Sequence, residues 1–287
     1  MKIIISFALI VGMICNINFR VIHIILYLIV LDVCLANTDT LRILNYNIYG
    51  LNPILTKDKS PDRIKSIFLE AEKYDIIFFQ ENWYYQMLVT EILNNHEVII
   101  AKKTNFIRKK NPKRSSGLNL AVLNNINIDY FEENLFSECN GFLFNYNDCL
   151  ASKGFIYSLI SKDNYHINLY VTHLDAGLVN GDKLARDTQL NELSNHVENL
   201  QNNFPTIICG DFNINYYKSV EIIDQFIKKN NLNILRWDNI ANTDEMIDYV
   251  FYKSGENHKI TILDYKINKT LYNKSDHLPV EFTIVIK

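Results

Sequence analysis

Several side chains that can ligate a cation or transfer a proton stand at the ends of predicted strands, where a rigid sheet presents reactive groups to its loops. They comprise four carboxylates, two amides and two histidines: Glu81, Asp211, Asp248, Asp276, Asn47, Asn213, His173 and His277. Taken singly, each of these residues is more often a turn, cap or surface residue. Taken together and in this order, they predict that the side chains converge on one site.

The elements that must position these residues are strands alternating with helices. The short, continuously apolar segment Asp75–Gln80 is typical of a strand that is buried on both faces. Helical spacing of Leu184, Leu190, Leu193, Val197 and Leu200 predicts a helix over Asp182–Gln201. The other predicted helices are Pro61–Lys73, Trp83–Asn94 and Ser219–Lys229, and the other predicted strands are Leu41–Ile48, Gly117–Leu123, Gly154–Ile160, Ile167–Thr172, Thr206–Cys209, Ile247–Tyr252, Lys259–Ile267 and Val280–Ile286. This order predicts one α/β domain with two packed sheets and helices outside.

The composition excludes several classes of protein. Of 287 residues, 48% are hydrophobic and 12% are aromatic, which argues against a disordered chain. The formal charge of −3 provides no general attraction to nucleic acid. Five cysteines are too few for a disulfide scaffold of this length.

Residues 1–36 differ from the remainder of the chain. The apolar runs Ile3–Ile14 and Val21–Leu31 are each too short to span a bilayer comfortably. A basic start, apolar stretches and the small residue Ala36 predict a secretory signal peptide over 1–36, followed by a catalytic domain over 37–287. We therefore expect a secreted or extracytoplasmic protein, or a membrane-anchored one if residues 1–36 are not cleaved. In an oxidising compartment, Cys139 and Cys149 could pair, whereas Cys209 is expected to be a buried free thiol.

Five short motifs carry a resemblance to a known family. They are Gln80-Glu81, Thr172-His173-Leu174-Asp175-Ala176, Gly210-Asp211-Phe212-Asn213, Ile247-Asp248-Tyr249 and Ser275-Asp276-His277. In type and order they resemble the endonuclease/exonuclease/phosphatase superfamily of metal-dependent phosphodiesterases, from about Leu41 to Ile286. The resemblance implies a DNase I-like four-layer α/β sandwich, with two packed mixed β-sheets and helices outside.

The resemblance also implies a role for each site residue. Glu81 resembles the main ligand of Mg²⁺, with Mn²⁺ or another divalent cation as the alternative, and Asn47 and Asp276 would assist it. His277 resembles the general base, and Asp248 the carboxylate that orients it. Asp211 would position the attacking water, whereas Asn213 and His173 would donate hydrogen bonds to the phosphate.

The substrate stays open between two classes. The segments Asp148–Tyr157 and Ser115–Leu118 are similar to those of neutral and bacterial sphingomyelinases, in which Lys153 would place a positive charge near the phosphate. This favours a phospholipid head group, with peripheral membrane contact and a monomeric enzyme. The membrane-entering hairpin of the bacterial enzymes is not evident, because only Lys253–Ser275 separates the Asp248 strand from Asp276. A basic stretch between Lys102 and Arg114 supports a secreted nuclease as the alternative, and a non-catalytic binding protein on the same fold is a third reading.

Overall fold

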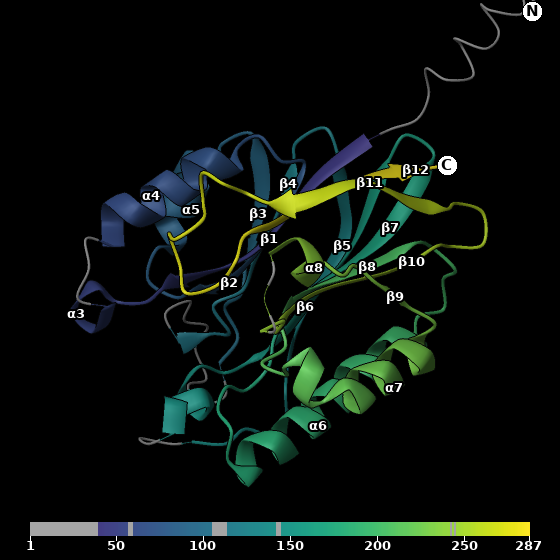
Figure 1. Cartoon of the computed structure of the whole chain (residues 1–287). Coiled ribbons are helices and arrows are strands. Elements are labelled where there is room, and N and C mark those ends of the chain that lie inside the picture. Colours follow the sequence, from purple (N-terminus) through teal and green to yellow (C-terminus); the bar gives the residue numbers. More distant parts are fainter. Residues whose placement is uncertain (1–39, 57–59, 105–113, 142–144, 242, 244) are drawn as a thin grey trace, which may run out of the picture. The chain divides into compact units, whose positions relative to one another are not determined.

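Two six-stranded mixed sheets pack against each other in the computed structural model, and helices cover their outer faces (Figure 1). The structure describes residues 40–287, apart from 57–59, 105–113, 142–144, 242 and 244. The expected signal peptide over residues 1–36 lies outside this part of the chain and stays a prediction. In the described residues, every helix is too short or too polar to cross a membrane.

Sheet A and sheet B each combine parallel and antiparallel pairs. In order across sheet A lie β11 (Ile260–Ile267), β12 (Val280–Ile286), β1 (Thr40–Gly50), β2 (Ile76–Asn82), β4 (Asn119–Leu123) and β3 (His96–Ile100). In order across sheet B lie β5 (Asn127–Leu135), β6 (Gly154–Lys162), β7 (Tyr165–His173), β8 (Thr206–Asp211), β10 (Asp248–Lys253) and β9 (Asn233–Ile234).

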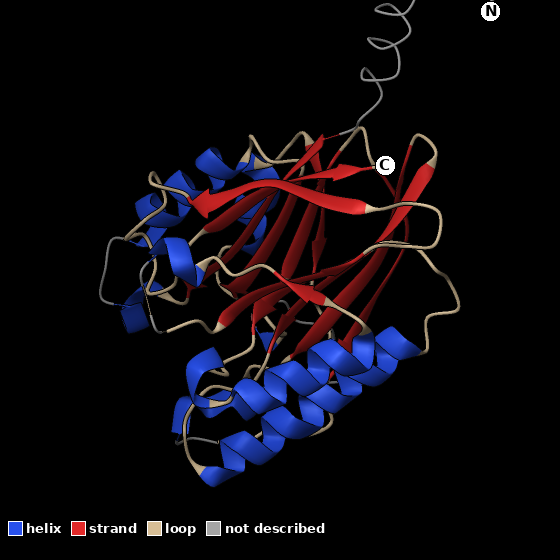
Figure 2. Cartoon of the chain, turned by 45° about the vertical axis from the view of Figure 1, so that its right-hand side comes forward, coloured by secondary structure: helices blue, strands red, loops and turns tan. Residues whose placement is uncertain are grey.

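Helices form the two outer layers (Figure 2). The main helices are α4 (Ser60–Ala71) and α5 (Gln86–Ile92) beside sheet A, and α6 (Asn180–Glu198) and α7 (Val220–Asn230) beside sheet B. Shorter helical turns are α3 (Pro53–Thr56), η2 (Asn145–Leu150), η3 (Tyr216–Lys218) and α8 (Asp238–Ala241). The expected four-layer α/β sandwich is confirmed.

The alternation of side chains along β1 explains how the layers are filled. Leu41 and Ile43 belong to the larger apolar cluster, which also includes buried residues of sheet B. Leu44, Tyr46 and Ile48 belong to the smaller cluster, which includes buried residues of α4. Successive side chains of a strand point to opposite faces. The even-numbered residues of β1 therefore pack against the helices, and the odd-numbered ones face the other sheet.

Most predicted elements are present, with ends shifted by a few residues, but three strands were missed. The strand β3 lies at one edge of sheet A, and β5 and β9 lie at the two edges of sheet B, where every residue of β5 is partly or fully exposed. The apolar spacing that predicted α6 included Leu184, but this residue is 68% exposed. Leu184 and Leu190 are six positions apart, which places them on different faces of a helix.

Candidate active site

Strand register in sheet B brings three of the predicted site residues side by side. The parallel pair β7 and β8 places His173 opposite Asp211. The antiparallel pair β8 and β10 then places Asp248 opposite Asp211 on its other side. Three residues from distant parts of the sequence therefore form one row across the ends of three strands.

Gly210 allows β8 to approach β7 closely immediately before Asp211. A Cβ atom at this position would lie 2.1 Å from the carbonyl oxygen of Thr172. Since any side chain would push the two strands apart, glycine is required where the backbones approach this closely. The close approach fixes Asp211 beside His173, whose Nε2 lies 3.5 Å from Asp211 Oδ2.

Sheet A contributes Asn47 and Glu81 from the parallel pair β1 and β2. Alternation along β2 would turn Glu81 towards the helices, as it does Ile77 and Phe79. Glu81 instead has a φ of +62°, a left-handed conformation that non-glycine residues rarely adopt. Its Oε1 accepts a hydrogen bond of 3.1 Å from Nδ2 of the buried Asn47. The unusual backbone thus accompanies an acidic side chain turned towards the site, as is common where strain serves function.

Asn47 links the residues of the two sheets. Besides Glu81, its Nδ2 donates a hydrogen bond of 3.1 Å to Asp211 Oδ2 and lies 3.3 Å from His277 Nε2. Burial raises the pKa of Glu81 to about 7, although the neighbouring His277, Asn47 and Lys153 oppose this effect. The site therefore concentrates acidic groups that favour either a proton or a cation.

His277 lies between two carboxylates. Its Nδ1 is 2.8 Å from Asp248 Oδ2, and its Nε2 is 3.5 Å from Asp211 Oδ2. Burial lowers the pKa of His277, but the charges of Asp248, Asp211 and Glu81 outweigh it and hold the pKa well above its ordinary value. The pKa of Asp248 rises to about 6, mainly because the carboxyl group is buried. This arrangement suits a base whose second nitrogen is held by a carboxylate.

His173 and Lys153 form the opposite wall of the site. Lys153 Nζ lies 3.0 Å from His173 Nε2 and donates to the carbonyl oxygen of Leu174 at 2.6 Å. Burial first, and the charge of Lys153 second, hold the pKa of His173 well below its ordinary value. The Oδ1 atom of Asp148 pairs with Lys153 Nζ at 2.7 Å inside the protein. No role for Asp148 was predicted from the sequence. The five-residue spacing from Asp148 to Lys153 gave no signal of this pairing.

A metal ion would find the donors Glu81, Asp211 and His277 close together. One ligand atom of each lies within 4.8 Å of the others. The two carboxylate donors suit a hard divalent cation. Asp211 belongs to this group, although the resemblance implied a role in positioning water. Asp276 does not: it is exposed, and its Oδ1 accepts a hydrogen bond from the adjacent Ser275.

Asn213 is close to the site but uses its amide within the protein. Its Nδ2 donates to the carbonyl oxygen of Leu174 at 3.0 Å, and its backbone N–H donates to Asp211 Oδ1 at 2.9 Å. A φ of +51° allows this tight turn after β8. The bond from Asn213 to a phosphoryl oxygen that the resemblance implied stays a prediction.

The predicted cysteine states agree with the structure. Cys139 and Cys149 form a disulfide, with their Cα atoms 5.2 Å apart, and Cys209 is a buried free thiol. The disulfide ends one residue after Asp148 in the sequence. It therefore fixes the segment that supplies the partner of Lys153.

No protein-family model and no curated protein matches the sequence, but the fold matches solved structures. The β-toxin of Staphylococcus aureus, in a structure with bound magnesium ions, is 18% identical with a TM-score of 0.65, covering 85% of this chain and 99% of that one. An endonuclease/exonuclease/phosphatase family protein from Bacteroides thetaiotaomicron is 17% identical with a TM-score of 0.65, covering 87% and 96%. Sphingomyelinase C from Streptomyces griseocarneus is 13% identical with a TM-score of 0.62, covering 86% and 99%. The DNase I-like fold is thereby confirmed.

Proposed function

We propose that this chain is a metal-dependent phosphodiesterase that cleaves a phospholipid head-group diester, with sphingomyelin as the leading substrate. The observation that carries the proposal is the position of His277, between Asp248 and Asp211 and beside Glu81. The fold is also that of a sphingomyelinase C. This geometry supplies a base, a carboxylate that orients it, and oxygen donors for a divalent cation.

Each side chain of the site has a separate role in the proposed hydrolysis. Asp248 accepts a hydrogen bond from the Nδ1–H group of His277, which leaves Nε2 free to take a proton from the attacking water. Asp211, whose Oδ2 lies 3.5 Å from His277 Nε2, would orient that water. The water oxygen bonds to phosphorus, the bond to the leaving alkoxide breaks, and the alkoxide takes up a proton. Glu81 and Asp211 would hold Mg²⁺, which when bound supplies Lewis-acid charge to a phosphoryl oxygen, and His277 Nε2 would then stay available to the water.

Two buried groups, Lys153 and Asn47, bring a positive charge and an amide dipole to the site, while their N–H donors are held by protein acceptors. Lys153 presents a buried ammonium group beside His173, and Asn47 presents an amide nitrogen between Glu81 and Asp211. Charges and dipoles fixed in a buried site stabilise the charge that develops in the transition state without reorganising. Lys153 and Asn47 would therefore stabilise the negative charge of a pentacoordinate phosphoryl group.

An exposed apolar tip beside the site supports a lipid substrate. The loop after β7 begins at the site residue His173 and ends in Leu178 and Val179, which are 79% and 53% exposed. Leu184, in the following helix, is also exposed, and Lys183 beside it is an exposed cation. Apolar side chains with an adjacent cation fit the boundary between acyl chains and phosphate head groups.

The base of this loop is held firmly, although its tip projects into solvent. Arg186 donates hydrogen bonds of 2.9 and 2.8 Å to the carbonyl oxygens of Asp175 and Gly177. Asp148 accepts a hydrogen bond of 2.8 Å from the backbone N–H of Ala176. A rigid base would let an apolar tip enter a lipid surface without displacing His173.

The basic stretch that supported a nuclease is partly occupied by internal contacts. The backbone N–H groups of Lys102 and Lys103 both donate to Glu133 Oε2 at 2.8 Å, and Lys103 Nζ also bonds to the carbonyl oxygen of Glu133. Residues 105–113 of the stretch lie outside the described part of the chain. The exposed apolar tip after β7 leads us to prefer the lipid substrate, and nucleic acid becomes an outcome of the test.

Hydrolysis of two substrates by the purified protein tests the proposal. Sphingomyelin vesicles and plasmid DNA would be incubated separately with Mg²⁺ or with EDTA, and the His277→Ala variant would be the control. We expect phosphocholine release that requires both Mg²⁺ and His277. Plasmid nicking without phosphocholine release would overturn the lipid assignment, and no Mg²⁺-dependent hydrolysis of either substrate would overturn both.

A further inference from the structure

Arg63 joins two chain segments that are far apart in the sequence. Its Nη1 donates to the carbonyl oxygens of Ile48 at 2.8 Å and Lys274 at 2.7 Å, and its Nη2 donates to the carbonyl oxygen of Tyr49 at 2.8 Å. Ile48 and Tyr49 lie near the end of β1, whereas Lys274 belongs to the loop between β11 and β12. Arg63 itself lies near the start of α4.

Each joined segment carries a site residue. Asn47 directly precedes the two β1 acceptors, and His277 follows Lys274 by three residues. The Nδ2 atom of Asn47 and the Nε2 atom of His277 lie 3.3 Å apart. The position of Arg63 thus bears on the distance between two groups of the site.

The strand ladder does not hold these segments together. Pairing of β1 with β12 ends at Asn45 and Val280, before either strand reaches the site residue. On its other side, β1 shifts register against β2 between Asn47 and Gly50, and Tyr49 has a φ of +48°. A shift of this kind interrupts the ladder hydrogen bonds and leaves backbone groups that need other partners. Arg63 is such a partner, because it donates hydrogen bonds to the carbonyl oxygens of Ile48 and Tyr49.

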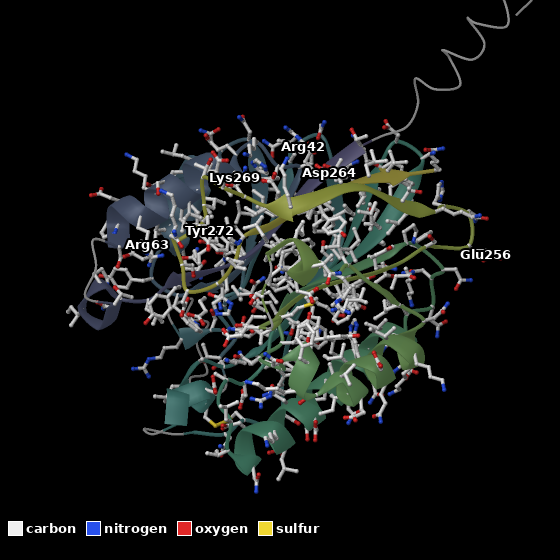
Figure 3. The ribbon with its side chains drawn as sticks, in the orientation of Figure 1. Arg42, Arg63, Glu256, Asp264, Lys269 and Tyr272 are labelled. Carbon is white, nitrogen blue, oxygen red and sulfur yellow. A yellow bond between two sulfur atoms is a disulfide. The ribbon has the colours of Figure 1, made fainter. Side chains whose placement is uncertain are left out.

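Other contacts attach the same loop to the same helix and strand. Leu271 is fully buried in the cluster that includes α4, and its carbonyl oxygen accepts a hydrogen bond of 3.1 Å from Tyr46 Oη. Lys274 Nζ donates to Ser66 Oγ at 2.8 Å. Figure 3 labels Arg63 and Tyr272 on the same side of the molecule. The loop before His277 is therefore docked on α4, and Arg63 is the residue that also reaches the end of β1.

We propose that Arg63 is a positioning residue, which sets the distance between Asn47 and His277 by tying the β1 end to the β11–β12 loop. This inference rests on the proposed function for its kinetic consequence, because it treats His277 as the base. A guanidinium group is suited to the task, since its planar fork donates several hydrogen bonds in fixed directions. An ammonium group in its place keeps the charge but cannot reproduce the fork.

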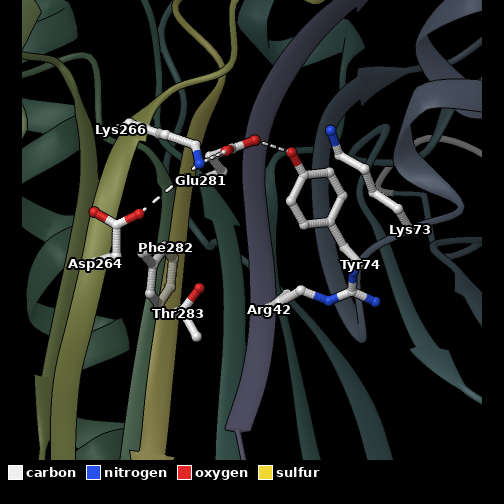
Figure 4. Close-up of a pocket in the computed structure, with 8 residues that line it drawn as sticks. All are labelled: Arg42, Lys73, Tyr74, Asp264, Lys266, Glu281, Phe282 and Thr283. Carbon is white, nitrogen blue, oxygen red and sulfur yellow. Dashed lines mark hydrogen bonds and ion pairs between the residues drawn. The ribbon is translucent and has the colours of Figure 1, made fainter.

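Arg63→Lys and Arg63→Met would be compared with Arg42→Lys and Arg42→Met. Arg42 lies on β1, the strand whose end Arg63 contacts, and it lines a surface cavity of about 250 Å³ with Tyr74, Lys266 and Glu281 (Figure 4). Its side chain is 56% exposed and pairs with Asp75 at 3.5 Å. The Arg42 variants thus remove or replace the same kind of side chain near the start of β1 without touching the loop.

We expect both Arg63 variants to lower kcat about 10- to 100-fold with little change in KM, since small misplacements of reacting groups have effects of this size. Low millimolar guanidinium should restore part of the kcat of Arg63→Met and none of that of the Arg42 variants. Hydrogen exchange should show faster amide exchange over residues 270–277 in Arg63→Met than in Arg42→Met. Full kcat in Arg63→Lys, or a lower melting temperature with unchanged kcat, would overturn the proposal.

The two proposals can fail separately. If the unmodified protein hydrolyses no phosphodiester, the proposed function fails, while the exchange measurement still tests whether Arg63 holds the loop. If hydrolysis occurs and exchange over residues 270–277 is the same in Arg63→Met and Arg42→Met, the positioning role of Arg63 fails and the proposed function stands.

Discussion

His277 Nδ1 lies 2.8 Å from Asp248 Oδ2, and this hydrogen-bonded contact joins the two sheets. Asp248 begins β10 of sheet B, whereas His277 precedes β12 of sheet A. The pair therefore exists only when the sheets are packed together. It fixes which ring nitrogen faces Asp211 and the water-binding side of the site.

Replacement of Asp248 by asparagine should lower kcat/KM by about 10³-fold or more, because an amide cannot hold His277 in the same tautomer or stabilise its protonated form. The pH–rate profile should also change. Burial lowers the pKa of His277, and the Asp248 charge is the first of the groups that raise it. A base works when neutral, so removing that charge should move the acid limb of the profile to lower pH. Asp264→Asn, which changes an exposed carboxylate on β11, is the matched control; equal profiles for both variants would contradict the assignment.

Metal affinity should separate Asp211 from Asp276. Glu81→Gln and Asp211→Asn each remove a carboxylate from the clustered donors, and each should weaken Mg²⁺ binding more than about tenfold in titration calorimetry. Asp276→Asn should change the affinity less than about threefold, because this exposed charge acts through screening solvent. A large loss in Asp276→Asn with none in Asp211→Asn would restore the ligand set that the resemblance implied.

The metal-free protein should lose stability as pH rises above about 6.5. Burial raises the pKa of Glu81 to about 7, and the neighbouring carboxylates hold the pKa of His277 well above its ordinary value. In this range the folded chain binds more protons than the unfolded chain, so the free energy of unfolding falls with increasing pH. The lowered pKa of His173 acts in the opposite direction, but only below its ordinary value of 6.5. Denaturant titrations in EDTA would measure this, and stability that rises through the range would refute it.

Asp148→Asn should lower the free energy of unfolding by about 3–5 kcal/mol, because it leaves the buried Lys153 ammonium without its charge partner. The Asp148→Leu/Lys153→Met double variant should recover much of that loss while remaining inactive. The control is Lys229→Met, which breaks an exposed pair with Glu198 and should cost less than about 1 kcal/mol. Equal stabilities of Asp148→Asn and the unmodified protein would show that Lys153 does not depend on this pair.

The apolar tip should matter for vesicles and not for soluble substrates. Leu178→Asp/Val179→Asp places two charges where apolar side chains would enter lipid, and hydrolysis of sphingomyelin in vesicles should fall more than about tenfold. Hydrolysis of a short soluble diester should be unchanged, because neither residue belongs to the site. Leu263→Asp, at a 55% exposed position on β11, serves as the control. Unimpaired vesicle sedimentation of the double variant would count against lipid contact through this loop.

The central strands could be predicted from the sequence, whereas three of the four edge strands, β3, β5 and β9, could not. Central strands such as β2 and β8 are buried on both faces and read as continuous apolar runs. The missed β5 alternates poorly, since Tyr130 and Phe131 are both about half exposed, and its register shifts between Ile128 and Tyr130. An edge strand needs apolar residues on one face at most, so its pattern carries little information.

The types of the site residues and their order along the chain were determined by the sequence itself. Asn47, Glu81, His173, Asp211, Asp248 and His277 could be named from strand ends and short motifs, because a rigid sheet presents reactive groups at its strand ends and loops. Their partners were decided by the tertiary structure. Sheet register places Asp211 between His173 and Asp248, and packing of the two sheets brings His277 to both carboxylates. Arg63 acts through partly buried contacts with residues distant in the sequence, and Asp148 acts through a buried pair with Lys153. Neither kind of contact leaves a periodicity in the sequence.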